Sequence, residues 1–295
     1  MFGVIDVSTV RGGAAPAGAA ADLLIEIPHG ATRTEDFTSL AARLQSPLPP
    51  SLIDFFHVNT DTGAFELAEA TARRFVIAEP TRVVQILRCK IPRTFIDCNR
   101  RIDAAPEEFK EGKVTPGLMP WITDAGDRAL LRGLYQQYVD TVHAAVDALA
   151  PRAAILALHS YAPRSVDVEV DFKIVENLHN AYQPEVEPTW PLRPEIDVIG
   201  RGVDGTAYAP AEVMRALIDN FAAIGIEVAD SKTYPLHPST LAWDHVMSHP
   251  GRALCVEVRR DLLAEPFAPF VEMQIGVAKL DRLAAPLASA LQRWY

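Results

Sequence analysis

The chain has 295 residues, of which 49% are hydrophobic, and its 28 basic and 38 acidic residues give a formal charge of −10. This length and composition predict a large buried core, in one α/β domain or in two smaller ones. The acidic balance argues against a general nucleic-acid binder and against a binder of anionic lipid surfaces, but a few arginines can still form a pocket for a small anion.

The first part of the chain, residues 1–21, is rich in alanine and glycine and lacks the basic-then-apolar order of a signal peptide. We expect it to form a loose N-terminal arm. No apolar run reaches the roughly 18 residues of a membrane span, so none is predicted. The odd number of cysteines, two of them inside apolar runs, favours buried reduced thiols and a cytoplasmic protein. These cysteines are Cys89, Cys98 and Cys255.

The predicted elements alternate along the chain between short apolar strands and longer amphipathic helices. Strands are expected at 23–27, 83–87, 93–97, 153–158 and 253–258, with shorter candidates at 168–175 and 226–229. Apolar residues at three- and four-residue spacing predict helices over 62–75, 124–149, 210–224 and 270–294. Asp124 is the expected N-cap of the longest helix. The alternation predicts a mainly parallel or mixed sheet with helices on both faces.

The chain shows no repeat of 20 to 50 residues and no low-complexity linker, so we expect a single domain over residues 1–295. The stretch 176–204 holds four of the 23 prolines and little periodicity. It is predicted to be a long ordered loop, or a cap over a site.

Two histidines stand at the ends of predicted strands, His29 after Leu23–Ile27 and His159 within Ile155–Tyr161. Taken alone, each histidine could equally cap a turn, lie in the core with its hydrogen bonds made, or bind a metal. Together they favour a metal, because neutral imidazoles on rigid strand ends are good zinc ligands and catalytic zinc takes three protein ligands. The third ligand should be a carboxylate, and the candidates are Glu35, Asp36 and Asp61.

Glu257 interrupts the apolar run Ala253–Val258. An ionised carboxylate is costly to bury without a partner. We therefore consider two roles for it, a catalytic base beside the metal or a salt bridge to Arg259, Arg260 or Arg93, and favour the base.

A fourth group of polar residues follows in Arg93, Asp97, Asn99 and Arg100. Guanidinium forks and an amide suit a substrate carboxylate. The alternative is a structural ion pair between Asp97 and Arg93 or Arg100. We expect both roles together: Asp97 holds an arginine in place, and that arginine binds the substrate carboxylate. Other histidines are weaker candidates: His143 is expected in the core or on the surface, and His237, His245 and His249 lie in a loop-rich stretch.

These segments, in this order, resemble the N-formylglutamate amidohydrolase family, whose members are relatives of the zinc carboxypeptidases. The resemblance covers about residues 24 to 260. It rests on Pro28-His29-Gly30, on Thr60-Asp61-Thr62 opening a helix, on Arg93 with Asp97-x-Asn99-Arg100, on a long helix carrying His143, on His159-Ser160-Tyr161 and on Glu257.

The resemblance implies a zinc-exopeptidase-like fold and assigns roles to individual positions. His29, Asp61 and His159 would hold Zn²⁺, and Glu257 would be the general base and proton shuttle. Arg93 would hold the substrate carboxylate or polarise the scissile carbonyl. Further substrate contacts are expected from Asn99, Arg100, Tyr161 and Lys232.

Two positions depart from the related patterns. Carboxypeptidases carry an acid three residues after the first histidine, where this chain has Thr32, and this difference moves the third ligand to Asp61. The family's Asn-x-Pro-(Phe/Tyr)-Lys-Gly-Gly stretch is replaced by the segment Asp230–His237. We expect this difference to affect the substrate pocket more than the metal chemistry.

The sequence therefore predicts a zinc-dependent hydrolase that cleaves the formyl or acyl amide bond of a small anionic substrate, such as an N-formyl or N-acyl amino acid. The alternatives are a zinc carboxypeptidase acting on short peptides and a catalytically silent binding protein of the same fold. Bound metal would separate an enzyme from the binding protein.

Overall fold

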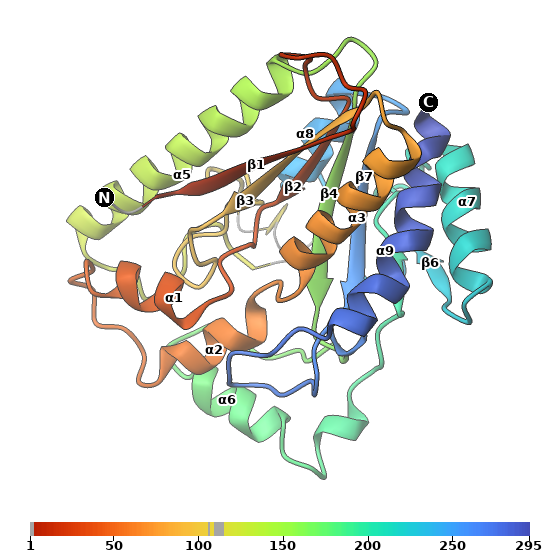
Figure 1. Ribbon diagram of the computed structural model, residues 1–295. Coiled ribbons are helices and arrows are strands. Elements are labelled where there is room, and N and C mark those ends of the chain that lie inside the picture. Colours follow the sequence, from red (N-terminus) through yellow and green to blue (C-terminus); the bar gives the residue numbers. More distant parts are fainter. Residues whose placement is uncertain (1–2, 106, 109–114) are drawn as a thin grey trace.

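A computed structural model of the chain describes residues 3–105, 107–108 and 115–295 (Figure 1). Its centre is a mixed sheet of seven strands in the spatial order β1-β3-β2-β4-β7-β5-β6. The strands are β1 (Ile5–Arg11), β2 (Leu23–Ile27), β3 (Val83–Cys89), β4 (Ala154–Tyr161), β5 (Ile196–Val198), β6 (Val228–Asp230) and β7 (Ala253–Arg259). The helices are α1 (Thr34–Ala41), α2 (Leu52–Asn59), α3 (Ala64–Ala78), α5 (Ala125–Asp147), α6 (Ile174–Ala181), α7 (Ala211–Ala222), α8 (Leu241–Ser248) and α9 (Val277–Leu291).

The central strands β3, β2, β4 and β7 are parallel, whereas β1 pairs antiparallel with β3 and β5 pairs antiparallel with β7. The carboxyl ends of the parallel strands therefore meet at one edge of the sheet, where ligands collect in α/β folds. This arrangement confirms the predicted α/β class and the mixed sheet.

Helices cover both faces of the sheet, as predicted. On one face α3, α7 and α9 pack on alternate strand residues such as Leu23, Ile25 and Ile27, and α3 and α9 lie side by side (Figure 1). On the other face α1, α2, α5 and α8 pack on the remaining positions, such as Leu24 and Ile155. Because both faces are buried, strands such as β2 read as almost continuous apolar runs.

The expected helices are present with shifted ends. Asp124 caps α5, and its side chain accepts a hydrogen bond of 3.0 Å from the Asp127 N–H, as predicted. On α5 the side chains of Leu134, Tyr138 and Val142 are buried. Among the described residues, no helix is long and apolar enough to cross a membrane.

Four sequence predictions about local structure were wrong. Residues 1–21 are not a loose arm throughout, because Ile5–Arg11 forms the edge strand β1 and pairs with β3 from Ile5 opposite Cys89 to Arg11 opposite Val83. Residues 93–97 are not a strand but a turn, in which the N–H groups of Phe95 and Ile96 point at the Pro92 carbonyl. The apolar side chains of this turn, Phe95 and Ile96, are buried in the core, and this composition suggested a strand.

The third is the uninterrupted loop expected over residues 176–204, because this stretch contains the end of α6, a 3-10 turn at Glu187–Thr189 and strand β5. The alternative, a cap over a site, stays a prediction. The short candidate at 168–175 is not a strand, since α6 begins at Ile174, and the candidate at 226–229 corresponds to β6. Short elements rich in proline carry too little periodicity to be found from sequence.

Candidate functional site

Three buried side chains, His29, Asp61 and His159, converge at the carboxyl edge of the sheet. His29 follows β2, His159 lies near the end of β4, and Asp61 comes from the turn between α2 and α3. The Asp61 Oδ2 atom lies 3.2 Å from His29 Nδ1 and 2.9 Å from His159 Nδ1. One candidate ligand atom from each residue lies within 4.8 Å of the other two.

The turn that carries Asp61 depends on local backbone geometry. The Asp61 N–H donates to the His29 carbonyl at 3.3 Å, which ties the turn to the end of β2. Gly63 has a φ of +89° just before α3, and a Cβ atom there would lie 2.8 Å from the Leu263 Cβ. A glycine is therefore required for the chain to enter α3 directly after Asp61.

Asp97 stands behind His29 and is fully buried. Its Oδ1 lies 2.7 Å from His29 Nε2 and accepts the Asn99 N–H at 2.9 Å, while its Oδ2 is 3.1 Å from Arg93 and 3.4 Å from Arg100. Burial favours the neutral acid, but Arg100, His29 and Arg93 outweigh it and hold the pKa of Asp97 well below its usual range. Asp97 is thus a fixed anion that orients the His29 ring.

This donor set fits a divalent metal. Two imidazole nitrogens and one carboxylate oxygen match the ligands of catalytic zinc sites, and a carboxylate behind a metal-binding histidine is their usual support. The pKa of Asp61 is lowered, because His29 and His159 outweigh the effect of burial, so the carboxylate is ionised. The buried Nε2 of His159 has no hydrogen-bond partner among the described residues.

Glu257 lies beside this cluster. It is in register with His159 on the neighbouring parallel strand, so both side chains leave the same face of the sheet. Burial is the main cause that raises the pKa of Glu257 to about 7, with Asp61 adding to it and His159, Arg193 and Arg93 opposing it.

The alternative role expected for Glu257, a salt bridge, is not what the structure shows. Its Oε2 is buried without a hydrogen-bond partner among the described residues. Arg259 pairs instead with Asp261 at 2.8 Å, and Arg260 donates to the Val58 and Ser160 carbonyls. Arg93 pairs with Asp97 at 3.1 Å, so none of the three candidate partners is bonded to Glu257 within the described chain.

The polar group at 93–100 forms the ion pairs predicted within it. Arg93 places Nη1 3.3 Å from His29 Nδ1 and 3.8 Å from Asp61 Oδ1, next to the cluster. Arg100 is buried and donates to the Thr115 and Asn99 carbonyls, and the Asn99 Oδ1 accepts from the Ala242 N–H at 3.4 Å. A substrate contact of Asn99 or Arg100 stays a prediction.

The remaining predicted contacts lie in different surroundings. Tyr161, on β4, is buried and its hydroxyl donates to the Pro194 carbonyl at 2.8 Å. The side chain of Lys232 is exposed, and its backbone N–H donates to Asp197 Oδ1 at 3.1 Å. The substrate role of Lys232 therefore stays a prediction without a described contact to the cluster.

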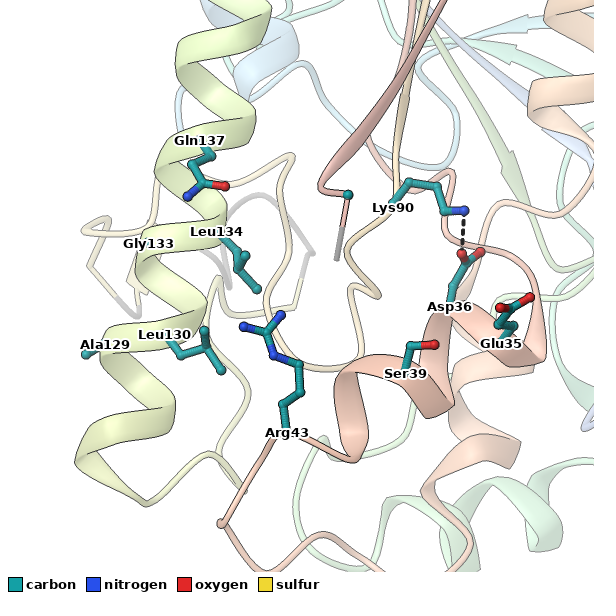
Figure 2. Close-up of a pocket in the computed structure, with 11 residues that line it drawn as sticks. Glu35, Asp36, Ser39, Arg43, Lys90, Ala129, Leu130, Gly133, Leu134 and Gln137 are labelled. Carbon is teal, nitrogen blue, oxygen red and sulfur yellow. Dashed lines mark ion pairs between the residues drawn. The ribbon is translucent and has the colours of Figure 1, made fainter. Parts of the chain in front are cut away.

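The alternative third ligands Glu35 and Asp36 are not in the cluster. Figure 2 shows both lining a different cavity, of about 920 Å³, between α1 and α5. Asp36 is paired there with Lys90 at 2.8 Å and approaches Arg88 at 3.5 Å. Among the expected carboxylates, Asp61 is the one that meets the two histidines.

Several residues near the site had no strong signal in the sequence. Arg193 and Tyr234 hydrogen-bond to each other at 2.9 Å, and the charge of Arg193 acts on Glu257. Arg260 is buried, and burial lowers its pKa to about 10. The only signal in the sequence was that each is followed by a proline, Pro194 and Pro235, which indicates a rigid backbone at these positions.

The weaker histidines lie apart from the cluster. His143 is exposed on α5, His237 is buried with Nδ1 2.8 Å from the Ser239 hydroxyl, and His249 is half-buried. His245 meets Glu26 at 2.5 Å inside the core. These positions agree with a structural role for each of them.

Comparisons with known proteins give a family match and solved structures of similar fold. A family model described as N-formylglutamate amidohydrolase matches residues 21–264. No curated protein matches the sequence. Two solved structures are similar in fold. One is N-formylglutamate amidohydrolase from Ralstonia eutropha JMP134, with a TM-score of 0.61, 18% identity and 99% of both chains covered. The other is a gene product of Agrobacterium tumefaciens, with a TM-score of 0.55, 16% identity and coverage of 99% of this chain and 94% of the other.

Proposed function

The chain belongs to the N-formylglutamate amidohydrolase family, and from that premise and the geometry of the site we propose that it is a metal-dependent hydrolase of N-formyl or N-acyl amino acids. The observation that carries the proposal is the buried His29–Asp61–His159 cluster with Glu257 in register beside it. A cluster of this kind holds a metal and places a proton acceptor next to it.

In this proposal His29, Asp61 and His159 hold the metal, and the donor set favours zinc. Asp97 keeps the His29 ring in place, because its carboxylate binds Nε2, the ring nitrogen that faces away from Asp61. When bound, zinc supplies Lewis acidity, which polarises an amide carbonyl and lowers the pKa of water.

Glu257 moves the protons of the reaction. Its carboxylate takes a proton from the attacking water, whose oxygen bonds to the acyl carbon, and then gives that proton to the leaving amine as the C–N bond breaks. The group is ionised for the first step and protonated for the second, as general acid–base catalysis requires.

The arginines bind and orient the substrate. Arg93, which borders the cluster, stabilises the negative charge that develops on the carbonyl oxygen. Arg100 and Asn99 hold the substrate carboxylate, and Asp97 keeps Arg100 in position. Arg100 has three nitrogens with five N–H groups, so its three described contacts leave donors for a ligand.

The proposal is tested by metal content and product analysis together. Purified protein is assayed for zinc, and N-formyl-L-glutamate, other N-formyl amino acids and unblocked dipeptides are compared as substrates. We expect one bound metal per chain, release of free amino acid from the formyl compounds and no cleavage of the dipeptides.

Two variants sharpen this test. His159→Ala should lose most of the metal and the activity, while His143→Ala, which replaces an exposed histidine on α5, should keep both. Preferential cleavage of dipeptides would support a carboxypeptidase instead. A protein without zinc that is not activated by added divalent metal would contradict the proposal and favour a binding protein.

A further inference from the structure

Arg193 is held rigidly at the border of the candidate site although the reaction described above does not use it. It is half-buried, in the proline-rich stretch between α6 and β5. Its backbone N–H donates to the Pro163 carbonyl at 2.9 Å, and its carbonyl accepts from Arg259 Nη1 at 3.0 Å. The backbone of Arg193 is thus fastened both to the segment after β4 and to β7.

Its guanidinium is fixed by three further hydrogen bonds. Nε donates to the Ser165 hydroxyl at 3.1 Å, Nη1 to the Ala162 carbonyl at 3.3 Å and Nη2 to the Tyr234 hydroxyl at 2.9 Å. The same group lies over the Tyr161 ring, with Cζ 5.0 Å from the ring centroid. An arginine held in this way has little freedom and can impose an orientation on its partners.

Among the partners of Arg193, Tyr234 has a hydroxyl proton that is still available for a hydrogen bond. A phenol hydroxyl has one proton to donate, and because the Tyr234 oxygen accepts from Arg193, that proton must point elsewhere. Among the described residues no group accepts it. Tyr234 lies within electrostatic range of Arg93 and Arg100, on the side of the proposed carboxylate clasp.

We propose that Arg193 is a positioning residue that aims the Tyr234 hydroxyl at the substrate carboxylate held by Arg100. The hydroxyl donor of Tyr234 then adds to the donors that Arg100 and Asn99 offer to the same carboxylate. This inference rests on the proposed function, because it assigns Tyr234 to the same substrate. It adds a contact from the loop after β6.

The test is a double-mutant cycle on the metal-loaded enzyme with N-formyl-L-glutamate as substrate. We expect Arg193→Met and Tyr234→Phe each to raise KM about tenfold, the scale of one hydrogen bond to a charged group. Tyr234→Phe should change kcat little, whereas Arg193→Met also removes a charge that lowers the pKa of Glu257, so the cycle is evaluated on KM. The double variant should be no worse than the poorer single variant, since Arg193 acts through Tyr234. Arg193→Lys, which can still donate, should recover part of the loss.

A matched control comes from the same region of the chain. Arg164 is also half-buried and donates to the Trp190 carbonyl at 2.7 Å, but it has no described contact with Tyr234. Arg164→Met should change thermal stability without raising KM. Losses that multiply in the Arg193→Met, Tyr234→Phe double variant would overturn the inference, as would a fall in kcat with unchanged KM or an unaltered Arg193→Met enzyme.

The inference can be judged separately from the proposed function. If the metal-loaded wild-type protein hydrolyses no formyl amino acid, the proposed function fails, and the same cycle is then run on the Kd of N-acetyl-L-glutamate measured by calorimetry. Non-additive losses of affinity in that cycle support the Arg193–Tyr234 pair. Absent or additive effects overturn it.

Discussion

Replacing Asp97 by asparagine is expected to weaken metal binding and to destabilise the fold at the same time. The Asp97 carboxylate is fully buried, and it meets His29 at 2.7 Å, Arg93 at 3.1 Å and Arg100 at 3.4 Å. Asparagine preserves the shape but removes the negative charge and places an NH₂ group opposite donors. The buried Arg100 and the half-buried Arg93 would then lose this carboxylate.

The magnitudes follow from these contacts. Removing one partner of a buried ion pair costs about 3–5 kcal/mol, because the remaining charge stays buried. Losing the carboxylate behind a metal-binding imidazole lowers metal affinity about 10- to 100-fold. We therefore expect the free energy of unfolding of Asp97→Asn to fall by about 3 kcal/mol or more, and its Kd for zinc to rise at least about tenfold.

Urea unfolding of the metal-free protein and zinc competition with a fluorescent chelator measure these two effects separately. Asp36→Asn is the matched control, because Asp36, on α1, is buried and paired with Lys90 and Arg88 but has no described contact with the cluster. It should lose stability and keep its zinc affinity. The reasoning is refuted if Asp97→Asn binds zinc as tightly as the wild-type protein, or if both variants lose the same affinity.

Three further outcomes are expected. Glu257→Gln should fold and retain metal but lose activity by about 10² or more, since it cannot accept the proton; lowered stability with normal turnover, measured by thermal unfolding and kinetics, would contradict a base. Arg100→Lys should lower kcat/KM several-fold for N-formyl-L-glutamate and less for a substrate whose α-carboxylate is an amide; equal losses on both would assign Arg100 a structural role. Glu26→Gln should destabilise most between about pH 4.5, the usual pKa of a glutamic acid, and pH 6.5, that of histidine. Burial opposes both shifts, but the pair lowers the pKa of Glu26 and raises that of His245, so its contribution fades as pH rises through the raised histidine pKa or falls through the lowered glutamate pKa. Urea unfolding across this range checks the sign, and a difference that does not vary with pH would contradict it.

Much of the architecture could be predicted because the relevant signals are local. Strands buried on both faces are short apolar runs, and β2, β4 and β7 were found in this way. Their parallel order then brings their carboxyl ends together, which is why His29 and His159 could be expected at one site. The N-cap of α5 at Asp124 is equally local.

Other features could not be predicted because they depend on distant contacts. The edge strand β1 is mostly exposed, so it lacks an apolar run and is specified by its pairing with β3. The turn at 93–97 is apolar because it is packed inside the core, and its composition therefore resembles that of a strand. Asp97 could be read as a partner of arginines, but its contact with His29 joins residues 68 positions apart.

Two glutamates show what the sequence determined by itself and what the tertiary structure decided. Glu26 and Glu257 each interrupt an apolar strand, and from this pattern alone both must be buried carboxylates in need of a partner. The fold brings Tyr138 from α5 and His245 from α8 within 2.6 Å and 2.5 Å of Glu26, and these partners outweigh burial and lower its pKa. Glu257 has no such bonded partner for its buried Oε2 among the described residues, and burial raises its pKa to about 7. Local sequence thus determined that both carboxylates lie in the sheet, whereas the partners that the fold brings to each one decided which is a structural ion and which is poised to exchange a proton.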